Sequence, residues 1–371
     1  MRILGLLFLC LFGNALAAVL PEERADMLYH SYDGGGAVID GPSFLVRKNL
    51  GDSVSVGLNH YVDNVTSASI DVLVNASEYT ENREENSVNI DYLRQKTTMS
   101  LGYTASKESD FDATTVSLGI SQDMFGDLTT VSMSFALGDN IVGQNGDDTF
   151  EETAKVRSYR VGISQILTKN LLMALTFEAI TDQGYLNNPY RSVRYLNPDG
   201  STYSFQPEVY PQTRTSNAIA LRANYYLPQR AALHGGVRVF DDSWGIEATT
   251  YEVGYTFPYG EDLIIETSYR FHDQGSADFY SDLFPFEDAQ NFLARDKELS
   301  TFTSTTFGVG ASYEFGRSWS AIERGSLNLQ LDFINFRYSD FSDLTVVAPV
   351  GSEPLYSFDA TVTRFFASLW F

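Results

Sequence analysis

The chain has 371 residues and carries 48 acidic against 25 basic side chains, a formal net charge of −23. This acidic excess argues against nucleic acid as a partner, because DNA and RNA attract basic proteins through their phosphates. Aromatic residues make up 14% of the chain, yet the mean hydropathy is slightly negative at −0.16. No apolar stretch approaches the roughly twenty residues that a membrane helix needs. The composition instead suits strands that are apolar on one side only, as in an outer-membrane barrel.

The first residues fit a secretory leader. Arg2 gives a basic start, residues 3–12 form an apolar run, and residues 14–18 (NALAA) offer an A-x-A cleavage site. The sequence therefore predicts a cleaved signal peptide over 1–17 and a single mature domain over 18–371. An exported, acidic chain of this kind is expected in the cell outer membrane, among anionic surface lipids such as lipopolysaccharide.

Alternation of apolar and polar residues between turn signals predicts about sixteen β-strands. An even number is what a single-chain outer-membrane barrel needs, so the fold predicted is an all-β, antiparallel up-and-down transmembrane barrel. The expected strands are 24–32, 36–47, 52–63, 85–93, 97–105, 112–122, 128–138, 156–166, 170–181, 215–226, 230–240, 246–257, 261–272, 301–315, 326–337 and 357–371.

The connections between these strands differ in length in a regular way. Most links on one side are tight turns of three or four residues, such as 49–51, 94–96 and 258–260. The links on the other side include five long ones, which are 64–84, 139–155, 182–214, 273–300 and 338–356. Short periplasmic turns opposite long extracellular loops are typical of outer-membrane barrels. A soluble β-sandwich gives no reason for this asymmetry.

The last expected strand ends on an aromatic residue. Phe365, Ala367, Leu369 and Phe371 alternate with polar or aromatic neighbours, and Phe371 is the last residue. In a lipid-embedded barrel the last strand must pair with the first, because an open edge would leave backbone groups unbonded. Phe371 resembles the terminal assembly signal that the barrel-assembly machinery recognises. We expect the tyrosines near strand ends to form the interfacial girdles: Tyr61, Tyr92, Tyr159, Tyr225, Tyr255 and Tyr269.

The side of each strand opposite the apolar face carries ionisable residues, which we expect to point into the lumen. Two interpretations stay open: these groups pair into a network that rigidifies the barrel, or they select solutes. Sixteen strands normally enclose an aqueous channel. The inward set is Asp91, Arg160, Glu178, Arg222, His234, Arg238, Glu252, Glu266, Arg270, Glu314, Asp332 and Arg364.

Two long loops are candidates for narrowing the lumen. The 182–214 loop contains Arg191 and Arg194, which we expect to line a constriction or hold an anion, unless they form salt bridges with lumen carboxylates that fix the loop. The 273–300 loop is rich in Phe and Tyr, and residues 287–298 suggest a short helix.

Catalytic and metal-binding patterns are weak. The four histidines (His30, His60, His234 and His272) fall on different strands, and no G-x-S-x-G motif is present. Acidic residues gather at 139–152 but lack the spacing of an EF-hand. The only cysteine lies in the leader, so the mature chain has no thiol. We expect no enzyme, no bound metal and no cofactor.

The chain carries several long motifs, at 52–71, 120–131, 163–172, 179–195 (AITDQGYLNNPYRSVRY), 230–236, 243–247 and 296–301. Together these motifs resemble a Gram-negative family catalogued as a domain of unknown function (number 3570). The resemblance covers essentially the whole mature chain and implies an outer-membrane barrel without assigned biochemistry. Genes of this family often neighbour those for thioredoxin-like proteins and a flavin-transferring enzyme, so the resemblance also implies periplasmic redox-related partners.

Two functions of different classes are compatible with the sequence. The first is a porin-like channel for small polar or charged solutes, with a lumen narrowed by loops. The second is a non-conducting receptor or scaffold for periplasmic or extracellular partners.

Overall fold

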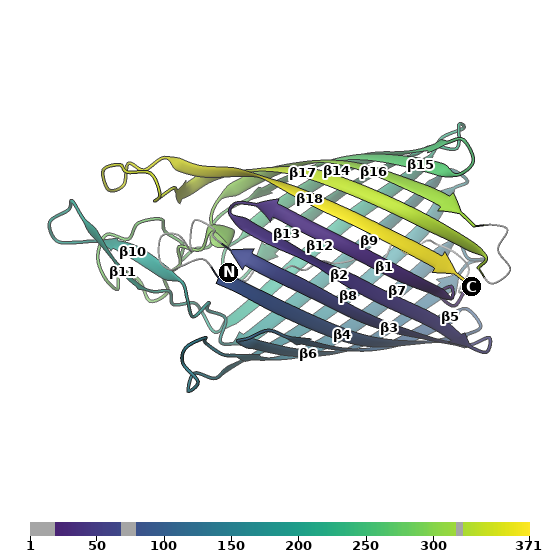
Figure 1. Cartoon of the computed structure of the whole chain (residues 1–371), viewed down its shortest axis with the longest axis horizontal. Coiled ribbons are helices and arrows are strands. Elements are labelled where there is room, and N and C mark those ends of the chain that lie inside the picture. Colours follow the sequence, from purple (N-terminus) through teal and green to yellow (C-terminus); the bar gives the residue numbers. More distant parts are fainter. Residues whose placement is uncertain (1–18, 68–78, 317–321) are drawn as a thin grey trace.

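The computed structural model describes residues 19–67, 79–316 and 322–371, and shows one closed antiparallel barrel of sixteen strands (Figure 1). The expected fold is therefore confirmed, while the leader over 1–17 lies outside the described residues. The barrel strands are β1 (Arg24–Gly34), β2 (Ala37–Leu50), β3 (Val54–Ser67), β4 (Tyr79–Arg94), β5 (Thr97–Lys107), β6 (Phe111–Met124), β7 (Thr129–Val142), β8 (Glu152–Thr168), β9 (Leu171–Gly184), β12 (Thr213–Tyr226), β13 (Ala232–Asp242), β14 (Glu247–Tyr259), β15 (Leu263–Gln274), β16 (Phe302–Phe315), β17 (Arg324–Ser342) and β18 (Leu355–Trp370).

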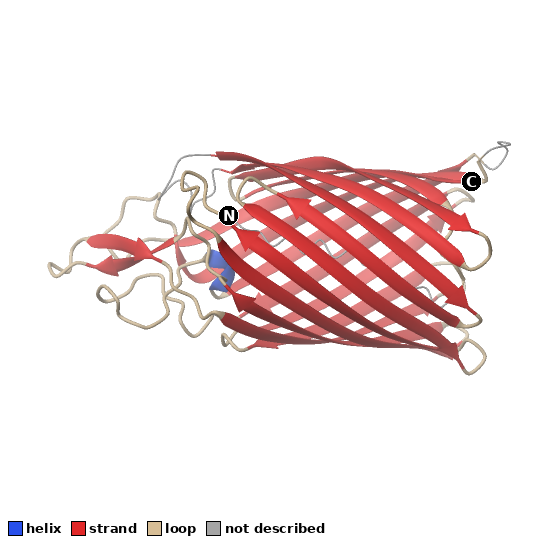
Figure 2. Cartoon of the chain, turned by 90° about the horizontal axis from the view of Figure 1, so that it is seen from below, coloured by secondary structure: helices blue, strands red, loops and turns tan. Residues whose placement is uncertain are grey.

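The barrel closes where its first and last strands meet. β1 pairs with β2 on one side and with β18 on the other, with Arg24 opposite Trp370 and Gly34 opposite Ala360. This seam removes the free edge that lipid would not tolerate. The short turns and the C-terminus lie at one end of the barrel, and the long loops gather at the other (Figures 1 and 2).

The outer surface of the barrel is apolar, as the strand alternation predicts. On β17, Leu327, Leu329 and Phe333 are exposed, whereas Ser326 and Asp332 on the opposite face are buried. Exposed apolar side chains in such a continuous band are stable only against lipid. Within the described residues, no helix is long and apolar enough to cross a membrane.

The long-loop end contains two short strands that the sequence did not predict. β10 (Ser192–Leu196) and β11 (Tyr203–Pro207) pair into a separate hairpin, seen beyond the barrel mouth in Figure 1. Its turn is stabilised by the Asp199 carboxylate, which accepts hydrogen bonds from the backbone N–H groups of Ser201 and Thr202 at 2.9 and 3.1 Å.

Two sequence-based expectations are wrong. Residues 287–298 form no α-helix, because Leu293 and Ala294 make backbone bridges to Val209 and Tyr280 of neighbouring segments instead of bonding along a helix. The loop contains only a 3₁₀ turn, η1 (Lys297–Leu299). Tyr61 does not join the interfacial girdle: it stacks on the buried ring of His30, with centroids 5.0 Å apart.

Candidate functional site: the lumen wall and its loop cap

The wall formed by β12 to β15 carries charged side chains that face open space. Arg222, Glu252 and Arg270 lie at inward positions and are exposed, which in a closed barrel means exposed to the lumen. In the strand pairing, Glu252 is directly opposite Arg270, and Arg222 and Glu252 share Gly236 as a partner. In the described part of the chain, none of these three forms an ion pair. If these charged groups served only to rigidify the barrel, they would form ion pairs.

Two further predicted lumen arginines share one carboxylate. The guanidinium of Arg160 lies 2.5 Å from the Glu178 carboxylate, and that of Arg238 lies 3.7 Å from it. Glu266 accepts a hydrogen bond from the Thr256 hydroxyl at 3.3 Å. This part of the lumen wall therefore combines paired and unpaired charges.

The wall on the other side of the seam is more tightly bonded. Asp91 accepts hydrogen bonds from Arg47 at 2.5 Å and from Ser100 at 2.7 Å. His30 lies 2.7 Å from the Asp63 carboxylate. Both carboxylates are buried, so these groups rigidify the wall and are closed to a solute.

Aromatic rings occupy adjacent inward positions near the long-loop end of β16, β17 and β18. Phe336 and Phe358 stack with centroids 4.6 Å apart and an interplanar angle of 19°. Tyr338 is buried beside them, and its ring lies 5.5 Å from that of Phe302 and 5.6 Å from that of Tyr356. We call these five residues the aromatic shelf. These residues were not among the predicted site residues, although the aromatic positions 336, 338, 356 and 358 alternate along their strands.

Three long loops pack together beyond the barrel mouth (Figure 2). They are residues 185–212, 275–301 and 343–354, and we call them the loop cap. Tyr210, Trp244, Phe279 and Leu299 belong to a buried cluster that joins two of these loops to the β13–β14 turn. The indole N–H of Trp244 donates to the Thr213 carbonyl at 2.9 Å. The cap therefore has a hydrophobic core of its own.

Arg194 is buried inside the cap and lines no constriction, which corrects the sequence-based expectation. Its side chain has 0% exposure and forms ion pairs with Asp282 and with Glu353, the latter at 2.7 Å. These carboxylates come from the other two loops. A neighbouring cation, Arg295, also bonds Asp282, at 2.9 Å, and lies over the Phe341 ring at 4.4 Å. Arg194 and Arg295 therefore tie three loops together.

Arg191 likewise lies within the cap, where its side chain is largely buried and its guanidinium forms an ion pair with Asp296. Close by, Glu208 is almost fully buried and accepts hydrogen bonds from the Tyr210 hydroxyl at 2.6 Å and the Arg295 backbone N–H at 2.7 Å. Burial, with a smaller contribution from the Asp296 charge, raises the pKa of Glu208 to about 7. The salt-bridge alternative is therefore correct in that both loop arginines form ion pairs, but it is wrong in the partners, which are carboxylates of the loops and not of the lumen.

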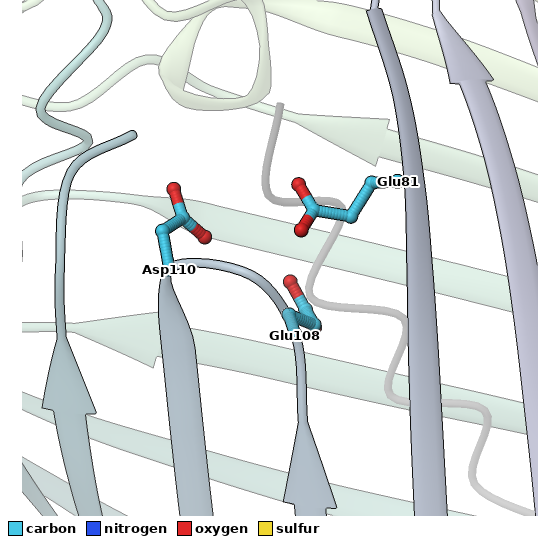
Figure 3. A group of neighbouring side chains, drawn as sticks. All are labelled: Glu81, Glu108 and Asp110. Atoms are coloured by element: carbon cyan, nitrogen blue, oxygen red, sulfur yellow. The ribbon is translucent and has the colours of Figure 1, made fainter. Parts of the chain in front are cut away.

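Among the residues that the structure describes, the acidic residues at 139–152 do not form a cluster that could hold a metal ion, but three other acidic residues do. Glu81, Glu108 and Asp110 bring carboxylate oxygens within 4.8 Å of one another at the barrel rim (Figure 3). Glu81 already accepts from the Ser109 backbone N–H at 2.8 Å, and Asp110 accepts from the Tyr190 hydroxyl at 2.5 Å. Oxygen ligands of this kind suit Ca²⁺, but exposed carboxylates commonly gather without a metal.

Phe371 lies just beyond β18 at the short-turn end of the barrel. The Lys48 ammonium lies 5.1 Å from the centroid of its ring. Its role as an assembly signal stays a prediction, as do contacts with lipopolysaccharide, with the barrel-assembly machinery and with periplasmic redox-related proteins.

The sequence profile of a family described as "Protein of unknown function (DUF3570)" matches residues 74–160 and 149–326. The chain belongs to the DUF3570 family. The resemblance seen in the sequence motifs is thereby confirmed. No curated protein matches this DUF3570 chain significantly.

Solved structures align with this DUF3570 protein at very low sequence identity. A bacterial polysaccharide outer membrane secretin has a TM-score of 0.51 and 8% identity, over 95% of this chain and 99% of that one. OmpT of Vibrio cholerae has a TM-score of 0.44 and 10% identity, over 96% and 100% of the two chains. The siderophore receptor PirA from Pseudomonas aeruginosa has a TM-score of 0.43 and 11% identity, over 95% of this chain and 64% of the receptor. The first of these similarities supports an outer-membrane barrel fold and carries no specific activity.

Proposed function

We propose that this protein is a porin-like outer-membrane channel for small polar or charged solutes, narrowed by the loop cap. The observation that carries the proposal is the exposure of Arg222, Glu252 and Arg270 inside the barrel without an ion pair in the described residues. Ser132 and Ser134, at inward positions on β7, are exposed as well. Charged and hydroxyl groups left open at mid-barrel fit a hydrated passage, because a packed lumen would bury and pair them.

Single-channel recording in planar bilayers tests the proposal. In KCl we expect stepwise conductance, and we expect Arg194→Ala to raise the conductance or the open time, because it loosens the cap. Arg157 provides a matched control, since it is exposed at an outward position on β8 and Arg157→Ala should behave as the wild type. A barrel that is folded by heat-shift electrophoresis but electrically silent in both the wild type and Arg194→Ala would refute the channel.

A second candidate, a receptor with a closed lumen, has one observation in its favour. The cap holds its loops together by buried ion pairs and projects the β10–β11 hairpin, where Phe205 is exposed. An electrically silent, folded barrel would favour this function. The two candidates are therefore separated by the same recording.

A further inference from the structure

The aromatic shelf is unusual for its place in the molecule. The inner face of a hydrated outer-membrane barrel is normally polar. Here Phe302, Phe336, Tyr338, Tyr356 and Phe358 occupy neighbouring inward positions on three adjacent strands. Five aromatic rings at such positions call for an explanation beyond strand propensity.

Anchoring of the loop cap explains only the upper part of the shelf. Tyr338 is buried and packs on Phe341, which in turn lies under the Arg295 guanidinium. Phe336 and Phe358 lie one inward position deeper and remain partly exposed. One face of each ring is covered by the other in the stack, and only part of the ring surface stays available inside the barrel.

Arg270 forms no ion pair among the described residues and lies within reach of these rings. Arg270 shares its row of the sheet with Thr306 and Ile334, whereas Phe336 belongs to the next inward row, opposite Ser304. Strand geometry therefore separates Arg270 from Phe336 by about 10 Å across two strands and about 7 Å along them. His272 lies in the same row of the sheet as Phe336, and its ring is 5.5 Å from that of Phe302.

We propose that the lumen binds aromatic carboxylates, with the ring on Phe336 and Phe358 and the carboxylate on Arg270; this inference rests on the proposed channel function and names its substrate class. Aromatic rings stack favourably in offset or edge-to-face arrangements. A guanidinium binds a carboxylate through charge-assisted hydrogen bonds.

Because of the position of Glu252, a solute needs both an aromatic ring and a carboxylate to bind well. Because Glu252 is directly opposite Arg270 in the pairing, its charge weakens the attraction of Arg270 for any anion. An anion without a ring is therefore held weakly, and a ring without a charge gains only the stacking contribution. The site selects solutes that carry both.

Block of the KCl current by added solutes tests the inference in planar bilayers. Benzoate should reduce the wild-type current at a concentration at least tenfold below acetate or benzamide, which carry only the charge or only the ring. Phe358→Leu and Phe336→Leu keep an apolar side chain of similar size but remove the ring, and each should weaken the block by about two- to tenfold. Arg270→Gln should weaken it by about tenfold.

Phe333→Leu is the matched control, because Phe333 lies on the outer face of β17 and is exposed there. It should leave the block by benzoate unchanged. Equal block by benzoate and acetate, or an unchanged block in both shelf variants, would overturn the inference while leaving the channel intact.

Binding of benzoate to the purified barrel, measured by calorimetry, separates the two proposals. If KCl gives no current, the channel function fails, but a benzoate affinity that falls in Phe358→Leu and not in Phe333→Leu still supports the shelf as a binding site. If KCl gives current and benzoate neither binds nor blocks, the aromatic carboxylate is the wrong substrate class.

Discussion

The arginines of the loop cap and those of the lumen wall have opposite environments. Arg194 and Arg295 are buried, and each bonds a loop carboxylate: Arg194 pairs with Asp282 and Glu353 of the two other loops, and Arg295 pairs with Asp282 of its own loop. Arg222 and Arg270 are exposed and, among the described residues, form no ion pair. The side chain is the same, and the difference lies in which segments surround it.

The comparison separates the cap arginines, which stabilise the fold, from the lumen arginines, which can bind a ligand. A buried guanidinium without partners is strongly unfavourable, so the cap arginines must be compensated by the carboxylates that surround them. An exposed guanidinium costs little because water solvates it. The lumen arginines are therefore free to exchange water for a passing anion.

The largest effect is expected from removing a cap arginine. Arg194→Ala takes the ion-pair partner from Glu353, whereas Asp282 keeps Arg295, and losing one partner of a buried pair typically costs about 3–5 kcal/mol. The urea midpoint of Trp244 emission measures cap stability when the other two tryptophans are replaced by Phe. We expect the cap transition to move to clearly lower urea, ahead of barrel unfolding. An unchanged midpoint would mean that the ion pairs do not hold the cap.

The next effect is a pH dependence of the same transition. Glu208 has a pKa of about 7 in the folded cap, above its ordinary value near 4.5, so the folded cap binds its proton more tightly than the unfolded loop does. The cap should therefore lose stability as pH rises from about 4.5 to 7, by at most about 3 kcal/mol. Glu208→Gln should remove this dependence. A flat wild-type profile over that range would contradict the assignment.

Two other carboxylates, Asp282 and Glu353, determine how the stability of the loop cap falls at acid pH. Arg295 and Arg194 hold the pKa of Asp282 below its ordinary value against the opposing effect of burial, and the Arg194 hydrogen bond does the same for Glu353. Their contribution is complete above their ordinary pKa values and disappears as the pH falls through the lowered ones. The wild-type cap should therefore be most stable near pH 4.5, where the contribution of Glu208 begins to fall and those of Asp282 and Glu353 approach completion.

The smallest effect on stability is expected in the lumen wall. Arg222→Gln removes an exposed charge that has no ion-pair partner in the described chain, so the unfolding midpoint should shift by no more than about 0.5 kcal/mol. In a KCl gradient, the same variant should move the reversal potential towards cation selectivity. A large loss of stability would show that Arg222 is structural and would remove the contrast with Arg194.

The barrel was predictable from the sequence because strand period and turn chemistry are local signals. Every expected strand overlaps one of the sixteen in the barrel, and the predicted inward position of Arg222 or Glu252 follows from alternation alone. The structure extends several strands towards the long loops, as at β17, where the expected end at residue 337 becomes Ser342. Boundaries moved because the loops pack on these strand ends.

The loop cap was not predictable in the same way. The partners of Arg194 are 88 and 159 residues away in the sequence, and no periodic pattern relates irregular loops to one another. The acidic residues Asp282 and Glu353 had no local feature that marked them as buried. Only the folded arrangement identifies which of the 48 acidic residues face the cap arginines.

The seam between β1 and β18 sets the order of events during assembly. Its partners, such as Arg24 and Trp370, lie near opposite ends of the sequence, whereas every other strand pair joins segments closer in the chain. Contacts between distant segments form late, because the long intervening chain must first be ordered. We therefore expect the seam to be the last contact to form, with unpaired backbone groups exposed on both edge strands until then. A slow step in any intermediate hairpin prolongs that vulnerable interval for the whole molecule.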